Sequence, residues 1–470
     1  MLIAGYSALA FWLYMKHIST RNHGTRIFYG AVAFVGAFLL FGANIIIAIP
    51  KPLPLGVIVE RVQKGMTKAL LAQQTDGTTN EQRGGFRFAQ HGGSHDTQVM
   101  TTAQALYALE TQNSALPQIS IVARNALSYF ERSRVPPSSN SSCQMDTGQQ
   151  DGWAYIKPLS WGVTEINSWV LLAEMVSLRP SPAPQIWAPT ETPAVVTKIK
   201  QDLIALANRQ HNHSGWAPIA KTDNDTHLRT YSTVMALWAL EEARRNFVIS
   251  KEIGRMFDQP IEDGFRWLLG KWAIDDDNKN PSGLQPNPSW KESVYPGLTA
   301  QAIYVLELIQ QNQPGLDDEK KFAKAKSKFV EWGAGEFWGS YSLQSLDVSN
   351  NLSLNDSDRY LEHEPYTVEG MTFLWYPWTL AALKQLRDDD TLSLSDRRTA
   401  RQLWLSMLGR IDGYWKFAQD YQAIYPVAEG LAAINMNLPS VNMEAAACAS
   451  LLCIAIPSRE AMVQRYIPQS

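Results

Sequence analysis

The feature that most constrains the fold is a repeat that recurs along most of the chain. Each copy has a glycine, an aromatic or apolar residue, a polar loop and then an apolar segment rich in Ala-Leu pairs, as in "SGWAPIAKTDNDTHLRTYSTVMALWALEEA" from Ser214. A spacing of roughly 65 residues between copies is too long for one solenoid unit and suits a pair of helices. The glycines that mark the six copies are Gly85, Gly152, Gly215, Gly283, Gly335 and Gly413.

The repeat contains two kinds of helical segment. Those before the marker glycines, such as "VVTKIKQDLIALANRQ" and "IEDGFRWLLGKW", carry charged residues on one face. Those after the loops, such as "STVMALWAL", are apolar on nearly all sides, as helices covered on every side must be. Closing six such pairs into a ring buries the apolar helices inside the charged ones and leaves no exposed apolar end. The sequence therefore predicts an all-α fold, an (α/α)6 toroid of six helix pairs.

The glycine-aromatic pair has a structural interpretation. Glycine adopts the left-handed conformation that ends many helices, and the aromatic ring can pack beneath the following turn. We therefore expect Gly84, Gly85 and Phe86 to form a structural hinge rather than part of a catalytic site.

The first 50 residues differ in character from the rest. Residues 28–49 are uncharged and apolar over the length that spans a bilayer as a helix, and residues 1–15 form a shorter apolar stretch. The expected organisation is a membrane anchor of one or two transmembrane helices at residues 1–50 and a toroid at 51–470, with a polar insertion at about 340–367. The flanking basic residues do not decide the orientation, although a cytoplasmic toroid is slightly favoured.

Charge and cysteine content exclude several classes of protein. The formal net charge is -3 and no block of Lys or Arg interrupts that balance, so a nucleic-acid partner is not expected. The three cysteines, Cys143, Cys448 and Cys453, form no CxxC pair and lie beside no histidine at zinc-ligand spacing. We expect no bound metal and no cofactor.

The motifs "GGF…TTAQALYAL", "DGW…SWVLLAE" and "SGW…STVMALWAL" resemble the repeats of the terpenoid cyclase and protein prenyltransferase β-subunit superfamily. The resemblance covers about residues 57–456. It implies an α/α toroid whose central cavity takes an isoprenoid or another lipid. Together with the N-terminal anchor and the non-catalytic alternative below, the expected partners are a lipid bilayer, a hydrophobic ligand and a protein. A fold of this kind carries more than one activity, so the catalytic signatures decide the function.

The signatures of both enzyme branches are missing from this chain. The cyclases have a D-x-D-D-T stretch at an inner-helix start, and the positions that align with its acid hold Met100, Glu165, Tyr231 and Gly297. The prenyltransferases bind zinc with a D-x-C stretch, and "VEGMTFLWY" places Glu369 at the aspartate and Met371 at the cysteine. A thioether is a poor zinc ligand, which agrees with the expectation that no metal is bound.

Candidate site residues follow from the toroid geometry. The starts of the inner helices point backbone donors into a concave mouth, where ligands collect. His95 beside Asp96 is a candidate acid-base pair there, and Glu165 and Glu369 are candidate carboxyls. These four are the predicted catalytic residues. The predicted cavity-lining residues are Asn167, Tyr231, Tyr295, Tyr425 and Glu429.

Three functions remain open at this stage. The resemblance favours a membrane-anchored enzyme that acts on an isoprenoid or another lipid. The missing signatures favour a non-catalytic toroid that binds a ligand or a protein as a sensor or complex subunit. Carboxyl groups at the inner-helix starts keep open a carbohydrate-active (α/α)6 enzyme, because such enzymes cleave sugars with two acids.

Overall fold

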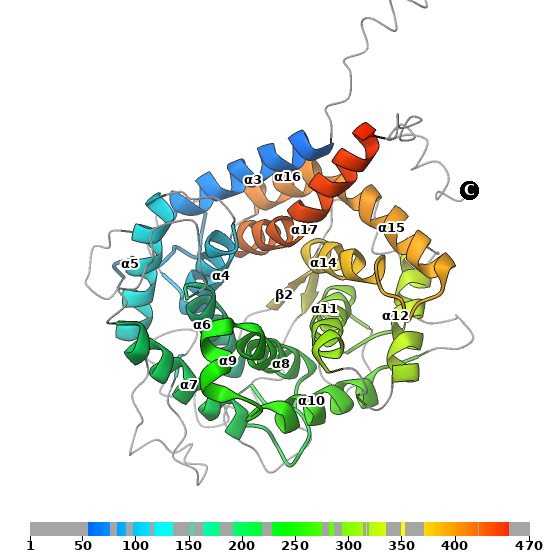
Figure 1. Cartoon of the computed structure of the whole chain (residues 1–470). Coiled ribbons are helices and arrows are strands. Elements are labelled where there is room, and N and C mark those ends of the chain that lie inside the picture. Colours follow the sequence, from blue (N-terminus) through cyan, green and yellow to red (C-terminus); the bar gives the residue numbers. More distant parts are fainter. Residues whose placement is uncertain are drawn as a thin grey trace, which may run out of the picture. The chain divides into compact units, whose positions relative to one another are not determined.

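The computed structural model describes most of the toroid but not the N-terminal 54 residues. The described residues are 55–75, 82–90, 97–112, 117–134, 152–153, 163–178, 191–218, 228–274, 282–285, 294–313, 316, 319–334, 349–352, 371–421 and 423–450. They are almost entirely helical, and the helices form an inner ring surrounded by an outer ring (Figure 1). The prediction of an all-α toroid built from helix pairs is confirmed at this level.

The inner ring consists of the apolar helices that follow the loops of the repeat. Each contacts the next around the ring, and the last of them contacts the first. Every residue of the second inner helix is buried, which explains why its sequence has no polar face. The inner helices are α4 (Val99–Glu110), α6 (Thr164–Val176), α8 (Thr230–Arg245), α11 (Pro296–Asn312), α14 (Trp375–Leu386) and α17 (Tyr425–Ser450).

The outer ring consists of amphipathic helices that bury one stripe against the inner ring. In α3 this stripe includes Val59, Val62, Met66 and Leu70, which recur at helical spacing. The last outer position differs from the others, because two helices fill it and the glycine of the sixth repeat lies inside the second of them. The outer helices are α3 (Leu55–Leu71), α5 (Pro117–Ser133), α7 (Thr192–Asn208), α10 (Asp258–Lys271), α12 (Glu319–Ala334), α15 (Leu394–Leu408) and α16 (Ile411–Asp420), with the short α9 (Phe247–Ile253) between α8 and α10.

Contacts between the first and last repeats close the ring. The backbone N–H of Ile424 donates to the Phe88 carbonyl at 2.8 Å. The Gln63 amide donates to Asn435 Oδ1 at 2.7 Å, which joins α3 to α17 (Figure 1). An exposed ion pair at 2.7 Å between Arg61 and Asp412 adds little stability but agrees with the same register.

The glycine-aromatic pair is held by a hydroxyl or amide side chain from the next inner helix. The backbone N–H of Trp216 donates to Thr233 Oγ1 at 3.0 Å, and the indole N–H of Trp216 donates to the Leu206 carbonyl at 2.9 Å. A Cβ atom on Gly215 would lie 2.7 Å from that same Oγ1, so only glycine fits. Equivalent backbone bonds run from Phe86 to Thr102, from Trp153 to Asn167 and from Leu284 to Thr299.

The marker glycines have a structural role, as expected, but the physical reason for it differs from the predicted left-handed helix end at some of them. Gly85 and Gly215 do not have a positive φ, whereas Gly84 (86°) and Gly152 (140°) do. At Gly215 the requirement is therefore close approach to an inner helix and not a left-handed helix end. Gly152 combines both requirements, because a Cβ there would lie 2.3 Å from Asn167 Oδ1.

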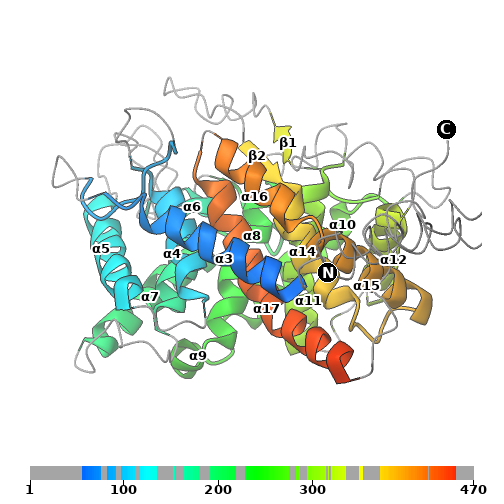
Figure 2. The same ribbon diagram turned by 90° about the horizontal axis from the view of Figure 1, so that it is seen from above.

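Part of the polar insertion pairs with the chain that follows it. The strand β1 (Ser349–Leu352) lies antiparallel to β2 (Met371–Leu374), which leads directly into α14, and the two strands pack against α11 and α14 (Figure 2). The other residues of the insertion lie outside the described part of the chain. The two strands are a small exception to the all-α prediction.

The predicted membrane localisation is corrected by the structure. Within the described residues, which start at Leu55, no helix is both long enough and apolar enough to cross a bilayer. The two apolar stretches from which the anchor was predicted, residues 1–15 and 28–49, lie outside the described residues.

Candidate functional site

A cluster of aromatic side chains occupies the axis of the barrel. Trp238 lies at its centre, with ring-centroid distances of 5.1 Å to Trp169, 5.2 Å to Trp378, 5.3 Å to Tyr107 and 5.9 Å to Tyr304. All four contacts have nearly perpendicular rings, a favourable arrangement for aromatic pairs. These five residues, from five inner helices, are called the aromatic plug below. The inner-helix aromatics therefore pack against one another instead of lining an open isoprenoid cavity.

Three of the predicted site residues come together where the inner helices begin. Glu165 is at the start of α6, Tyr231 at the start of α8 and Glu429 in the first turns of α17, and all three are buried. The indole N–H of Trp169 lies 3.4 Å from the Tyr231 hydroxyl, and that of Trp378 donates to Glu429 Oε2 at 2.8 Å. The aromatic plug thus orients Tyr231 and Glu429 through its indole N–H groups.

The two carboxyls have different hydrogen-bond partners. Glu429 accepts from both Trp378 and the Gln104 amide, the latter at 2.9 Å. Glu165 accepts a hydrogen bond from the Ser232 hydroxyl through Oε1, while its Oε2 is buried and makes no hydrogen bond to the described residues. A buried carboxylate oxygen without a donor is costly, so Oε2 is the atom most open to a ligand or a proton.

Burial dominates the electrostatics of this group. It raises the pKa of Glu429 to about 8, opposed by the Trp378 hydrogen bond. It also raises the pKa of Glu165, opposed by Ser232 and by the charges of Arg229 and Arg209. The pKa of Tyr231 is raised by burial, by Glu429 and, more weakly, by Glu165. Burial therefore shifts the pKa of all three groups in the same direction.

The other predicted residues fall into two groups. Asn167 accepts the Trp153 backbone N–H at 2.9 Å and so takes the place that threonine has in other repeats. Tyr295 precedes α11 and is partly buried, and the Tyr425 hydroxyl donates to the Tyr421 hydroxyl at 3.1 Å. His95, Asp96 and Glu369 lie outside the described residues, so their predicted catalytic roles stay predictions.

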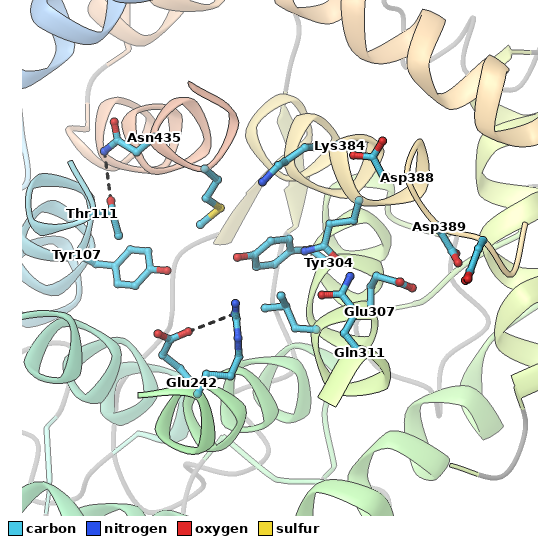
Figure 3. Close-up of a pocket in the computed structure, with 15 residues that line it drawn as sticks. Tyr107, Thr111, Glu242, Tyr304, Glu307, Gln311, Lys384, Asp388, Asp389 and Asn435 are labelled. Atoms are coloured by element: carbon cyan, nitrogen blue, oxygen red, sulfur yellow. Dashed lines mark hydrogen bonds and ion pairs between the residues drawn. The ribbon is translucent and has the colours of Figure 1, made fainter. Parts of the chain in front are cut away.

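A second site, which the sequence interpretation missed, lies at the opposite mouth of the barrel. A cavity of about 660 Å³ is formed by side chains near the C-terminal ends of α4, α8, α11 and α14 and by the middle of α17 (Figure 3). Tyr107 and Tyr304 belong to both the aromatic plug and this cavity, so the plug separates it from the carboxyl pair. This cavity is called the C-terminal pocket below.

The C-terminal pocket is lined mainly by charged and amide side chains. Glu242 is buried, and its Oε2 lies 3.7 Å from the Arg245 guanidinium. Behind the pocket wall, the fully buried Lys326 ammonium lies 2.9 Å from Glu307 Oε2 and 2.5 Å from Asp389 Oδ2. A sequence signal existed, because the charged residues of α8 and α11 lie only toward the C-terminal ends of these two helices, in "LEEARR" and "LELIQQN".

Neither site is arranged as a metal centre. Among the described residues, no three His, Cys, Asp or Glu side chains lie close enough together to hold a metal ion. The chemistry that the described groups offer is therefore proton transfer and hydrogen bonding.

The fold and these sites define a helical α/α toroid with buried carboxyls at one mouth and a polar pocket at the other. Comparison with known proteins does not assign the chain to a family within that class. No family model matches the chain, and no curated protein matches it. A solved structure that it resembles is an inactive variant of the α-1,6-mannanase GH76A of Salegentibacter sp. HEL1_6, in complex with α-1,6-mannotetrose. The identity is 11%, the TM-score is 0.46, and the match covers 80% of this chain and 99% of that one.

The comparison corrects the resemblance to terpenoid cyclases and prenyltransferases. The structure that was matched is a mannanase and belongs to neither of those families. The helix-pair repeat indicated the fold class, and no family model supports the family. The structure gives the physical reason, because the Gly-aromatic motif serves to dock loops onto inner helices and carries no catalytic group.

Proposed function

We propose that the chain is a carbohydrate-active enzyme of the α/α toroid class, with Glu165 and Glu429 as its reacting carboxyl pair. The observation that carries the proposal is that Glu165 of α6 and Glu429 of α17 are both buried where the inner helices begin, the first hydrogen-bonded to Ser232 beside Tyr231 and the second to Trp378 of the aromatic plug. Enzymes that cleave glycosidic bonds use such a pair, one acid and one base or nucleophile.

The surroundings of the two carboxyls support different roles. With a pKa of about 8, Glu429 holds its proton at neutral pH and can give it to the leaving glycosidic oxygen. Burial raises the pKa of Glu165 too, but the Ser232 hydrogen bond and the charges of Arg229 and Arg209 oppose that rise, and its Oε2 has no hydrogen-bond donor among the described residues. In the proposed reaction Glu165 takes a proton from water, the water oxygen bonds to the sugar carbon, and the carbon–oxygen bond breaks as Glu429 protonates the departing oxygen.

The test is hydrolysis by the purified full chain. Neutral oligosaccharides and polysaccharides, with α-1,6-mannotetrose among them, are incubated with the protein, and new reducing ends are measured. We expect at least one substrate to be cleaved and the rate to fall above about pH 8, where Glu429 loses its proton. Glu429→Gln and Glu165→Gln should each lower the rate by about 100-fold or more, the usual contribution of a general acid or base.

Glu174→Gln is the matched control. Glu174 is also on α6, and burial also raises its pKa, to about 8, but it neighbours Asp202 of the outer helix α7. This variant should keep its activity. Full activity of Glu429→Gln and Glu165→Gln would disprove the carboxyl assignment. Binding of oligosaccharides without hydrolysis would instead favour a non-catalytic toroid.

A further inference from the structure

The C-terminal pocket has no part in the proposed hydrolysis. It lies beyond the aromatic plug from Glu165 and Glu429, and its floor is formed by Tyr107 and Tyr304 (Figure 3). Its volume of about 660 Å³ is within the range of pockets that bind small molecules. Side chains from five inner helices converge on it, so their positions are fixed by the most buried part of the fold.

Most carboxylates that line the pocket already have a cation beside them. Glu242 has Arg245 at 3.7 Å, and Glu307 and Asp389 share the buried Lys326. These pairs neutralise much of the negative charge that the number of acidic residues suggests.

The turn after α14 also contains a carboxylate with a cation beside it, because Asp388 Oδ2 lies 3.0 Å from the Arg387 guanidinium. Asp390 also lines the pocket, but its side chain is exposed, so water solvates its charge. The acidic residues therefore do not make this a strong site for a cation.

Lys384 is the exception among the cations that line the pocket. Its side chain extends from α14 into the cavity, toward Tyr304 (Figure 3), and its ammonium has no hydrogen bond or ion pair with the described residues. Burial lowers the pKa of Lys384, and so do the charges of Arg387 and Arg245, while Asp388 acts in the opposite direction. A half-buried ammonium near two guanidinium groups is an electrostatic cost that an anion would relieve.

We propose that the C-terminal pocket binds a small organic anion whose carboxylate or phosphate group lies against Lys384 and Arg245. The pocket is larger than a carboxylate or phosphate group, so it has room for the rest of an organic ligand. Gln311 and Gln385 provide uncharged hydrogen-bonding side chains in the same cavity, and Gln385 Oε1 is buried without a hydrogen bond to the described residues. A ligand hydroxyl that donates to Gln385 Oε1 would satisfy it, so the ligand class is a sugar-sized acid or phosphate ester.

Binding can be measured without knowing the natural ligand. The probes are glucose 6-phosphate, glucuronate, glucose, inorganic phosphate and spermidine, each tested by calorimetry and by the thermal unfolding midpoint at constant ionic strength. We expect glucose 6-phosphate or glucuronate, or both, to bind and raise the midpoint, and glucose and spermidine to have no effect. The first two probes distinguish a phosphate ligand from a carboxylate ligand.

Substitution of Lys384 tests the position of the anion. Lys384→Gln should weaken binding of the anionic probe by about 10-fold or more without lowering the unfolding midpoint of the free protein, because it removes an ammonium that has no partner among the described residues. Lys416→Gln, which removes an exposed lysine of α16, is the charge-matched control and should bind as the wild type does. Glu429→Gln should also bind normally, which separates this proposal from the proposed hydrolysis.

Several outcomes would overturn the proposal. Binding of spermidine alone would show that the pocket prefers cations. Binding of inorganic phosphate alone would show that no organic ligand is selected. Unchanged binding by Lys384→Gln, or no binding of either organic anion by the wild type, would show that the lysine does not form an anion site.

Discussion

Replacing Glu174 by Gln should change how the stability of this protein depends on pH. The Glu174 side chain is buried at the contact between α6 and α7, with Oε2 free of hydrogen bonds to the described residues and Oε1 3.7 Å from the Lys198 ammonium. Burial and the nearby Asp202 raise its pKa from 4.5 to about 8, opposed by Arg134. The folded protein therefore keeps a proton that the unfolded chain releases.

The direction and size of the effect follow from that difference. Between pH 4.5 and about 8 the folded state binds more protons at Glu174 than the unfolded state, so the free energy of unfolding falls as pH rises. Each pKa unit corresponds to about 1.4 kcal/mol, so this one group accounts for a loss on the order of 5 kcal/mol across the interval. The stabilising contribution is fully present below pH 4.5 and is lost above the folded-state pKa.

The assay is chemical denaturation of wild type and Glu174→Gln at several pH values from about 5 to about 9, which bracket the raised pKa. The Gln variant cannot ionise, so its free energy of unfolding should fall less steeply with pH, and it should be the more stable of the two at the alkaline end. Glu60→Gln, which alters an exposed carboxyl, should follow the wild-type curve. Parallel curves for wild type and Glu174→Gln would refute the assignment of a raised pKa to this residue.

Two further substitutions test the packing of the repeat and of the C-terminal pocket. Thr233→Val should lower the free energy of unfolding by about 1–3 kcal/mol, because the buried Trp216 N–H loses its acceptor, whereas Thr233→Ser should keep most of it; equal stability of the Val and Ser variants in denaturation would contradict the role of the hydroxyl. Lys326→Met should cost about 3–5 kcal/mol at neutral pH, because it leaves Glu307 and Asp389 without their shared cation. Burial raises the pKa of Glu307, so that cost should shrink as the pH falls and Glu307 becomes protonated; a cost that does not change with pH would count against the ion cluster.

The fold was predictable from the sequence because it depends on patterns that repeat. The alternation of amphipathic and wholly apolar segments predicts two concentric rings, and α7, α10 and α12 lie where the charged segments were expected. The side chain that accepts the backbone N–H of the residue after each glycine was harder to predict. Thr102 and Thr233 look like ordinary inner-helix residues, and only the packing of a loop against the following helix reveals that they accept a backbone N–H.

The site was predictable only in part. The expectation that inner-helix starts gather polar groups led to Glu165, Tyr231 and Glu429, which are all buried near the starts of α6, α8 and α17. Periodicity alone could not show that Trp169 and Trp378 would meet across the barrel axis, because both a ligand cavity and a filled core produce the same apolar pattern. The choice between them depends on the lengths of facing side chains from five helices, which no local pattern contains.

The aromatic plug gives the two mouths of the barrel separate chemistry. At the inner-helix starts the plug donates indole N–H groups to Tyr231 and Glu429, so it orients these two side chains. On its other face Tyr107 and Tyr304 form the floor of the C-terminal pocket, where the nearby charges are fixed by Lys326 and its partners. A ligand in the C-terminal pocket cannot reach Glu165 and Glu429 through an axis filled by the aromatic plug. Any influence of the pocket on the carboxyl pair would therefore have to pass through the packing of Trp238 against its four aromatic neighbours.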